Sequence, residues 1–319
     1  MHKKIVVVIG ENILRIFITG ATGFIGKAAV IYLQGKGHSI TALVRDKNRA
    51  INILGKDVSI LGVDTKIEDL VSELDSCDAV INLAGIQLAG VRWTKKKKHE
   101  FHDSRVNLTN IISDAINECK APPKVLISAS AVGYYGDQKS IQLDETSPKG
   151  QGFLPDLCEE WEKAAIRSEN SGTRICLLRL GIVLGREGGI ISKIAPAFEA
   201  GIGAYIGNDN ETVSWIHQID VLKIIDLCLE NQSINGPINC TTSTPVTSKE
   251  FASAIQKSTN SKILLKIPKM LPKILLNEGV DVLTNSHNVL PNKLTTIGYK
   301  FKYPYLPEAL DTEFQNNDV

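Results

Sequence analysis

The sequence predicts an α/β protein of the Rossmann type, in which a doubly wound parallel sheet is accompanied by a smaller C-terminal substrate lobe. The first observation is an apolar run that ends at Thr19 and leads into Gly20, Gly23 and Gly26, followed at once by an amphipathic helix. A strand, a glycine turn and a helix in that order are the context that a dinucleotide-binding fingerprint requires. The second observation is the alternation of strand-like and helix-like runs over residues 14–180, which is typical of parallel strands joined by right-handed crossovers.

The remaining elements follow in order along the chain. Apolar runs bounded by polar or turn residues predict strands at 39–44, 58–63, 78–83, 124–128 and 174–180. We expect a long helix from Thr94, which acts as its N-cap, to about Cys119, and a second helix over 157–169. After Gly181 glycines break the pattern into short pieces. There we expect helices at 190–199, 221–229 and 248–257 and strands at 237–240 and 263–267.

This pattern divides the chain into three parts. Residues 1–13 form an N-terminal extension, residues 14–185 a nucleotide-binding Rossmann domain, and residues 186–319 the substrate lobe. The run Ile5–Ile9 could add a strand, but it does not compete for the cofactor role because no glycine turn follows it.

Composition excludes several classes of function. With 43% hydrophobic residues, 22% charged residues and a net charge of +1, the 319-residue chain is typical of a soluble globular protein. A net charge near zero argues against nucleic acid or an anionic membrane as an obligatory partner, and no apolar segment reaches the ~20 residues that span a bilayer. The six cysteines show neither a CxxC pair nor metal-ligand spacing. We therefore expect a cytoplasmic protein with reduced thiols and no metal site.

The glycine motif predicts how a dinucleotide is held. Gly20 allows a tight turn, Gly23 lets backbone N–H groups approach a pyrophosphate, and Gly26 lets the helix pack closely on the strand. The alternative is a glycine-rich loop that only turns the chain, and the strand and helix on its two sides argue against that. The expected cofactor-binding residues are Thr19, Gly20, Thr22, Gly23, Phe24, Ile25 and Gly26, with Asp64 after the third strand and Leu83, Ala84 and Gly85 at the end of the fourth.

Arg45 bears on which dinucleotide is bound. A dinucleotide fold usually carries an acidic residue after its second strand, where it binds the adenosine ribose, but this chain has Arg45 there. A guanidinium pairs with a 2′-phosphate that a carboxylate would repel, so NADP is favoured over NAD. The alternative is that Arg45 is one more solvated surface cation.

At this point the sequence resembles a known group. The glycine motif and the runs 82–85 and 128–136 look like the short-chain dehydrogenase/reductase superfamily, extended type. More closely, the chain is similar to the atypical epimerase-family proteins, which are commonly labelled NAD-dependent epimerase/dehydratase family and end in a domain of unknown function. The resemblance covers about residues 14–314, with the C-terminal domain at about 265–314, and implies a possible homodimer. The motifs of this closer match are 92–94, 104–105, 134–137, 157–162, 178–185, 214–217, 289–294 and 298–301.

Departures from the superfamily pattern concern the catalytic residues. Active members use a Tyr-x-x-x-Lys pair, in which the tyrosine is the general acid/base and the lysine lowers its pKa. Alignment of the helix near Trp161 places Leu154 at the tyrosine position and Cys158 at the lysine position, and neither can do that work. The superfamily asparagine is matched by Arg105, which we expect near both the cofactor and the reacting groups. Only Ser130 of the tetrad is retained.

Other residues could replace the missing acid. Tyr134 and Tyr135 follow Ser130 closely, and Arg105 could supply the positive field that a low-pKa phenol needs. Cys158 is a further candidate if Arg105 depresses its pKa, because only the thiolate is reactive. The alternatives are that the two tyrosines form a wall of the cofactor pocket and that Cys158 is a small buried hydrophobe.

Two functions are therefore expected from the sequence. The first is an NADP-dependent oxidoreductase or epimerase-like enzyme acting on a small or nucleotide-linked hydroxy or keto substrate held by Ser130. The second is a catalytically inactive NADP(H)-binding regulatory protein, whose occupied state is read by a partner. Fold alone does not decide between them, because one fold serves both uses.

Overall fold

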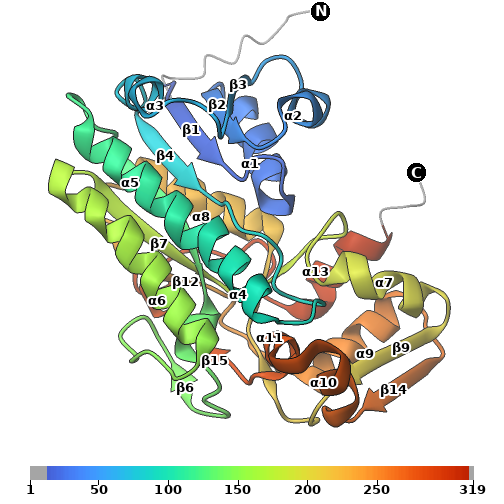
Figure 1. The fold of residues 1–319 in the computed structure, drawn as a ribbon. Coiled ribbons are helices and arrows are strands. Elements are labelled where there is room, and N and C mark those ends of the chain that lie inside the picture. The colour runs from blue at the N-terminus through green and yellow to red at the C-terminus, as the bar shows by residue number, and fades with distance from the viewer. Residues whose placement is uncertain (1–12, 316–319) are drawn as a thin grey trace, which may run out of the picture.

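The computed structural model of the protein describes residues 13–315, and a seven-stranded parallel sheet forms its centre (Figure 1). The strand order is β12-β7-β5-β4-β1-β2-β3. The possible strand Ile5–Ile9 lies outside the described residues. The sheet consists of β1 (Arg15–Thr19), β2 (Ser39–Val44), β3 (Ser59–Gly62), β4 (Ala79–Asn82), β5 (Val125–Ala131), β7 (Arg174–Leu180) and β12 (Gly236–Cys240).

The strand order reverses beside β1. The chain first adds β2 and β3 on one side of β1, and then β4, β5, β7 and β12 on the other. Thr19, the last residue of β1, lies opposite Leu43 of β2 and Asn82 of β4. Because the strands are parallel, the loops that follow them meet at one edge of the sheet. That edge, at the point where the order reverses, is where open α/β sheets bind their ligands.

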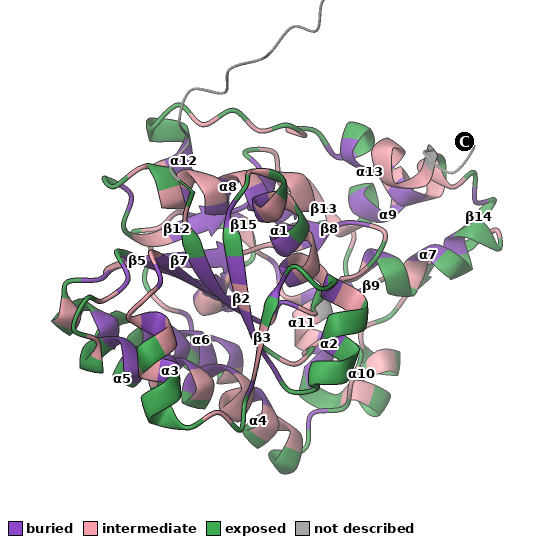
Figure 2. Ribbon diagram, turned by 90° about the horizontal axis from the view of Figure 1, so that it is seen from above, coloured by how far each residue is buried: buried purple, intermediate pink, exposed green. Residues whose placement is uncertain are grey.

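Helices cover both faces of the sheet, as Figure 2 shows in the view from above. One face carries α1 (Phe24–Gly35) and α8 (Gln218–Glu230), and the other carries α3 (Ile67–Leu74), α5 (Leu108–Glu118) and α6 (Phe153–Ile166). In β1, Ile16 and Ile18 join the core on the first face, while Phe17 joins the core on the second. Successive side chains of a strand point to opposite faces, so a sheet covered on both sides needs apolar residues at every position.

The C-terminal lobe has a core of its own. It packs α7 (Ile191–Glu199), α9 (Ser248–Ser258) and α13 (Leu306–Gln315) against the two-stranded sheet of β9 (Ile202–Ile206) and β14 (Ile263–Ile267). Buried side chains from distant parts of the sequence, including Phe198, Trp215, Phe251 and Leu310, fill this core. The remaining elements are short: α2 (Lys47–Leu54), α4 (Lys95–His102), β6 (Gln142–Leu143), β8 (Ile182–Leu184), β10 (Thr212–Val213), β11 (Trp215–His217), β13 (Val246–Thr247), α10 (Met270–Leu276), α11 (Asp281–Thr284), β15 (Asn288–Val289) and α12 (Asn292–Thr296).

The border between the two parts differs from the division at residue 185 that the sequence indicates. Both α8 and β12 follow residue 185 in the chain, yet both belong to the sheet domain. β12 pairs in parallel with β7, and α8 is tied to α1 by ion pairs from Lys36 to Asp226 and Glu230. The chain therefore leaves the sheet domain after β7, returns to it, and leaves again.

The expected long helix is interrupted. Thr94 caps its start as predicted, accepting a hydrogen bond from the N–H of Lys97 at 3.1 Å. However, a π-helical turn over Asp103–Asn107 separates α4 from α5. Such π turns inside α-helices change the direction in which side chains point, and they are frequent at functional sites. Within residues 13–315, none of the helices has both the length and the apolar character needed to cross a bilayer.

Candidate cofactor and catalytic site

The glycine loop between β1 and α1 is shaped by close backbone contacts. Gly20 has a φ of +70°, and a Cβ placed on it would lie 2.6 Å from the carbonyl carbon of Leu83. A Cβ on Gly26 would lie 2.1 Å from the carbonyl oxygen of Gly20. Gly23 is exposed, and its nearest neighbour would be 3.1 Å away. Gly20 and Gly26 are therefore required by packing, whereas Gly23 leaves the start of the helix accessible.

The start of α1 fits a phosphate group. Its N-cap residue, Gly23, has no side chain that could cap the helix, and the first turn contains no acidic residue. The first N–H groups of a helix have no partner within it, and the positive end of its dipole attracts anions. This chain thus offers the uncapped donors that the pyrophosphate of a dinucleotide needs.

The other expected cofactor-binding residues lie along the same edge of the sheet. Arg45 is exposed directly beyond β2, and Asp64 is exposed just beyond β3. The backbone of Leu83 and Ala84 lies against Gly20, and Gly85 is exposed next to them. Thr22 and Ile25 are half-buried at the start of α1.

Thr19 and Phe24 have neighbours that the sequence did not indicate. Thr19 is fully buried, and its hydroxyl donates to Oδ1 of Asn82 at 2.5 Å, which ties β1 to β4. The ring of Phe24 lies against Gly185 and Gly188, so the loop after β8 packs on this one side chain of the first turn of α1. The cofactor edge is therefore contacted by the part of the chain that leads into the C-terminal lobe.

Ser130 belongs to a buried charged network that sequence reasoning missed. Its hydroxyl donates to Oε1 of Glu162 at 2.6 Å. Nε and Nη2 of Arg179 donate to the two oxygens of the same carboxylate, each at 2.8 Å. Arg179 is 3% exposed and Glu162 is 6% exposed. Two features of the sequence could have indicated this network. Arg179 is a charged residue inside the apolar run of β7, and Glu162 lies one helical turn after Cys158.

The two tyrosines lie on this network in different ways. Tyr135 is fully buried, accepts a hydrogen bond from Nη1 of Arg179 at 2.9 Å and donates to Asn239 at 2.7 Å. Burial raises the pKa of Tyr135 to about 12, although Arg179 opposes the shift. Tyr134 is half-buried, and its ring packs under the guanidinium of Arg179 at 3.6 Å. The cation beside both phenols is thus Arg179, not Arg105 as we expected.

The charge of Arg105 acts on the Cys158 thiol, but burial outweighs it. Burial, strengthened by the charge of Glu162, raises the pKa of the Cys158 thiol to about 12, and Arg105 offsets this only in part. The expectation of a reactive Cys158 is therefore not met. A Cβ on Gly133 would lie 3.6 Å from Leu154 and 3.7 Å from Cys158, so both replaced positions of the Tyr-x-x-x-Lys pair face the end of β5.

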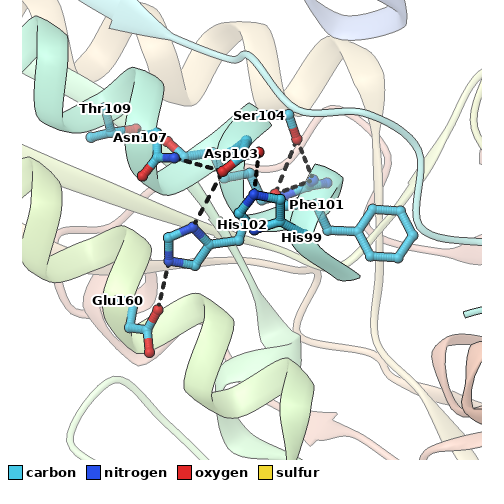
Figure 3. A network of polar contacts seen from close by, with 9 residues as sticks. His99, Phe101, His102, Asp103, Ser104, Asn107, Thr109 and Glu160 are labelled. Carbon is cyan, nitrogen blue, oxygen red and sulfur yellow. Dashed lines mark hydrogen bonds and ion pairs between the residues drawn. The ribbon is translucent and has the colours of Figure 1, made fainter. Parts of the chain in front are cut away.

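A surface cluster near the π turn is linked by hydrogen bonds and ion pairs. Figure 3 shows His102 of α4 pointing to Glu160 of α6, with Nε2 and Oε2 2.9 Å apart, while His99 pairs with Asp103. Among residues 13–315, no group of three or more His, Cys, Asp and Glu side chains is arranged to hold a metal ion. The cluster instead joins α4 to α6.

Comparison with known families decides where the chain belongs. Residues 16–240 match the family described as "NAD dependent epimerase/dehydratase family", and residues 267–313 match the family described as "Domain of unknown function (DUF1731)". The chain belongs to the NAD dependent epimerase/dehydratase family. This confirms the resemblance, and the fold agrees with it. The second match begins close to residue 265, where the C-terminal domain was expected.

Relatives of this epimerase-family protein are similar over most of their length. The "Epimerase family protein SDR39U1 homolog, chloroplastic" of Arabidopsis thaliana is 36% identical, with 94% of this chain and 86% of the relative covered. "Epimerase family protein ML0860" of Mycobacterium leprae is 34% identical, covering 92% of this chain and 93% of the relative. The crystal structure of human epimerase family protein SDR39U1 (isoform 2) with NADPH has a TM-score of 0.86 and 29% identity, covering 95% of this chain and 100% of that one.

Proposed function

We propose that this protein is an NADP(H)-dependent oxidoreductase or epimerase-like enzyme acting on a small or nucleotide-linked hydroxy or keto substrate. The observation that carries the proposal is the uncapped start of α1 behind Gly20 and Gly23, at the edge where the strand order reverses. The human relative crystallised with NADPH supports the choice of dinucleotide. When bound, the nicotinamide ring supplies hydride chemistry, while the chain supplies position and electrostatics.

Arg45 is the residue we assign to the preference for NADP(H). Its guanidinium is exposed beyond β2, where a 2′-phosphate would be neutralised by a charge-assisted hydrogen bond. We expect Arg45→Ala to weaken NADPH binding by about tenfold or more and to change NADH binding by less than about threefold. Isothermal titration of both dinucleotides into the purified protein measures this. Arg49→Ala, an exposed arginine one turn away in α2, is the matched control and should leave both affinities unchanged. Equal losses for NADPH and NADH would contradict a role of Arg45 in binding the 2′-phosphate.

Ser130 contributes to the reaction as a hydrogen-bond acceptor. Its own proton is directed to Glu162, a carboxylate that also accepts two hydrogen bonds from Arg179. The oxygen lone pairs of Ser130 are therefore what it offers to a ligand. A substrate hydroxyl or the amide group of a nicotinamide, both of which donate, would fit it. Its role is thus to orient the group that reacts.

Tyr134 is the proton donor that we propose in place of the superfamily tyrosine. Tyr135 is fully buried with both hydrogen-bonding roles of its hydroxyl used, and the Cys158 thiol is buried and neutral. Tyr134 is half-buried, and the face of its ring lies against the guanidinium of Arg179 at 3.6 Å. Of the candidates named from the sequence, Tyr134 combines a transferable proton with some exposure.

Turnover of the two phenylalanine variants tests this assignment. NADPH consumption is followed with a panel of aldehydes, ketones and nucleotide-linked keto sugars. We expect Tyr134→Phe to lower kcat by about a hundredfold or more while NADPH affinity stays within about threefold, the size of effect typical for loss of a general acid. Tyr135→Phe, the matched control, should lower thermal stability and leave kcat within about tenfold. Wild-type turnover in Tyr134→Phe would contradict the role of Tyr134.

One set of observations favours the second function, an NADP(H)-binding protein without turnover. Leu154 and Cys158 stand in place of the superfamily pair, and the hydroxyl of Tyr135 accepts a hydrogen bond from Arg179. This function would be supported if wild-type protein bound NADPH tightly but consumed none across the substrate panel. A measurable turnover that Ser130→Ala abolishes without weakening NADPH binding would exclude it.

A further inference from the structure

Two arginines of the described residues are buried, Arg105 and Arg179, and only one of them has an acidic partner. Arg179 makes two hydrogen bonds to the carboxylate of Glu162. Arg105 is 8% exposed, yet no carboxylate of the described residues lies within 4.0 Å of its guanidinium. Removing a cation from water without a counter-charge costs several kcal/mol, so an unpaired buried arginine needs an explanation.

The partners of Arg105 are all neutral. Nη2 donates to the carbonyl oxygen of Ile86 at 2.8 Å, and Nη1 makes two long contacts, to Phe101 O at 3.5 Å and Ser104 Oγ at 3.3 Å. Nε makes no hydrogen bond to any residue of the described chain. A guanidinium has five N–H donors, and those of Nε and Nη2 lie on one edge that suits the two oxygens of a carboxylate or phosphate.

The surroundings of Arg105 place it at the candidate site. The π turn over Asp103–Asn107 carries it, and the loop after β4 approaches it so closely that a Cβ on Gly85 would lie 3.0 Å from Cζ. The ring of Trp161 lies 5.2 Å from Cζ. Trp161 lies on α6, about one helical turn after Cys158, the position where the superfamily has its lysine. Burial lowers the pKa of Arg105 to about 10, which leaves it charged at neutral pH.

We propose that Arg105 binds an anionic oxygen group, a carboxylate or phosphate, on the substrate. This deepens the proposed function, because it names the substrate class of the same site as a hydroxy or keto compound that carries such a group. The anionic group that Arg105 binds belongs to the substrate and is not one of the phosphates of the dinucleotide. Those are assigned to the start of α1 and to Arg45, whereas Arg105 lies in the π turn before α5 and its guanidinium is 5.2 Å from the ring of Trp161 in α6.

Anion-dependent stabilisation of the NADPH-loaded protein tests the proposal. Thermal unfolding is measured in acetate, in inorganic phosphate and in chloride at equal ionic strength, so that general screening cancels. We expect acetate or phosphate at about 50 mM to raise the Tm of the wild type by about 2 °C or more over chloride. A rise with acetate alone identifies a carboxylate substrate, and a rise with phosphate alone identifies a phosphorylated one.

Three variants separate a bound anion from a structural role. Arg105→Gln keeps a donor for the carbonyl oxygen of Ile86 but has no charge, and it should lose the anion response. Arg105→Lys keeps the charge and should retain part of the response. Arg167→Gln removes an exposed arginine paired with Asp114, and it should respond like the wild type. The same anion response in Arg105→Gln as in the wild type, or none in the wild type, would overturn the proposal.

NADPH affinity distinguishes the failure of this proposal from failure of the proposed function. Titration of NADPH into wild type and Arg105→Gln should give dissociation constants within about threefold. A loss of about tenfold or more in the variant would assign Arg105 to the cofactor and overturn the substrate proposal while supporting NADPH binding. Absence of NADPH binding by the wild type would instead refute the proposed function, and the anion response of the apo-protein would then test Arg105 alone.

Discussion

Replacing Glu162 with glutamine is expected to lower the free energy of unfolding by about 3–5 kcal/mol. The substitution leaves the guanidinium of Arg179 buried, 3% exposed, without its counter-charge. Burial acts to lower the pKa of Arg179, and the hydrogen bonds and charge of Glu162 outweigh it and raise that pKa above its ordinary value. Once Glu162 is neutral, the desolvation cost remains without compensation. Chemical denaturation followed by circular dichroism measures the loss.

A neighbouring glutamate on the same helix provides the control. Glu160 has a side chain that is 51% exposed and pairs with His102 on the surface (Figure 3). Because exposed ion pairs contribute little, Glu160→Gln should cost less than about 1 kcal/mol. If Glu162→Gln cost no more than Glu160→Gln, the buried network would not be what holds β5, β7 and α6 together.

A methyl group at Gly26 is expected to abolish tight NADPH binding. The Cβ of alanine would lie 2.1 Å from the carbonyl oxygen of Gly20, within the turn that shapes the phosphate site. The contact is with backbone, so α1 must move away from β1, and its first N–H groups move with it. We expect Gly26→Ala to raise the NADPH dissociation constant by at least about tenfold, or about 1.4 kcal/mol, as measured by isothermal titration.

The control lies at the other end of the same helix. A Cβ on Gly35, the last residue of α1, would meet nothing within 4 Å. Gly35→Ala should therefore leave NADPH binding unchanged, and it should stabilise the protein slightly because alanine loses less backbone entropy on folding. Unchanged NADPH affinity in Gly26→Ala would show that the close contact at Gly26 does not shape the binding site.

The sequence indicated the backbone of the glycine loop better than the surroundings of the proposed catalytic residues. Gly20 and Gly26 have the tight contacts that the motif predicts, because the fingerprint is local and its residues lie within one turn of chain. Tyr135 was a candidate acid because it follows Ser130 in the chain, and Cys158 was a candidate because it aligns with the superfamily lysine. Burial raises the pKa of both groups. Burial depends on what other segments pack over a residue, and sequence spacing does not report it.

Arg179 illustrates the same limit from the other side. It is 44 residues from Tyr135 and 17 from Glu162 in the sequence, and it joins them by hydrogen bonds in the interior. The sequence shows that Arg179 lies in an apolar strand, but it does not show its partners. A charged residue in a strand can pair with side chains from any segment that packs against it. The π turn that carries Arg105 was also hidden, since the run from Thr94 to Cys119 has the local character of one continuous helix.

By itself the sequence determined the parallel sheet, the glycine turn at the end of β1 and the family to which the chain belongs. Each of these depends on periodicity or on residues close together in the chain, where local backbone geometry dictates residue type. Only the tertiary structure decided that β12 returns to the sheet, that Glu162 neutralises Arg179, and that Arg105 is left without a counter-charge. Those outcomes depend on which distant segments meet, because the free energy of a buried charge is set by its neighbours in space.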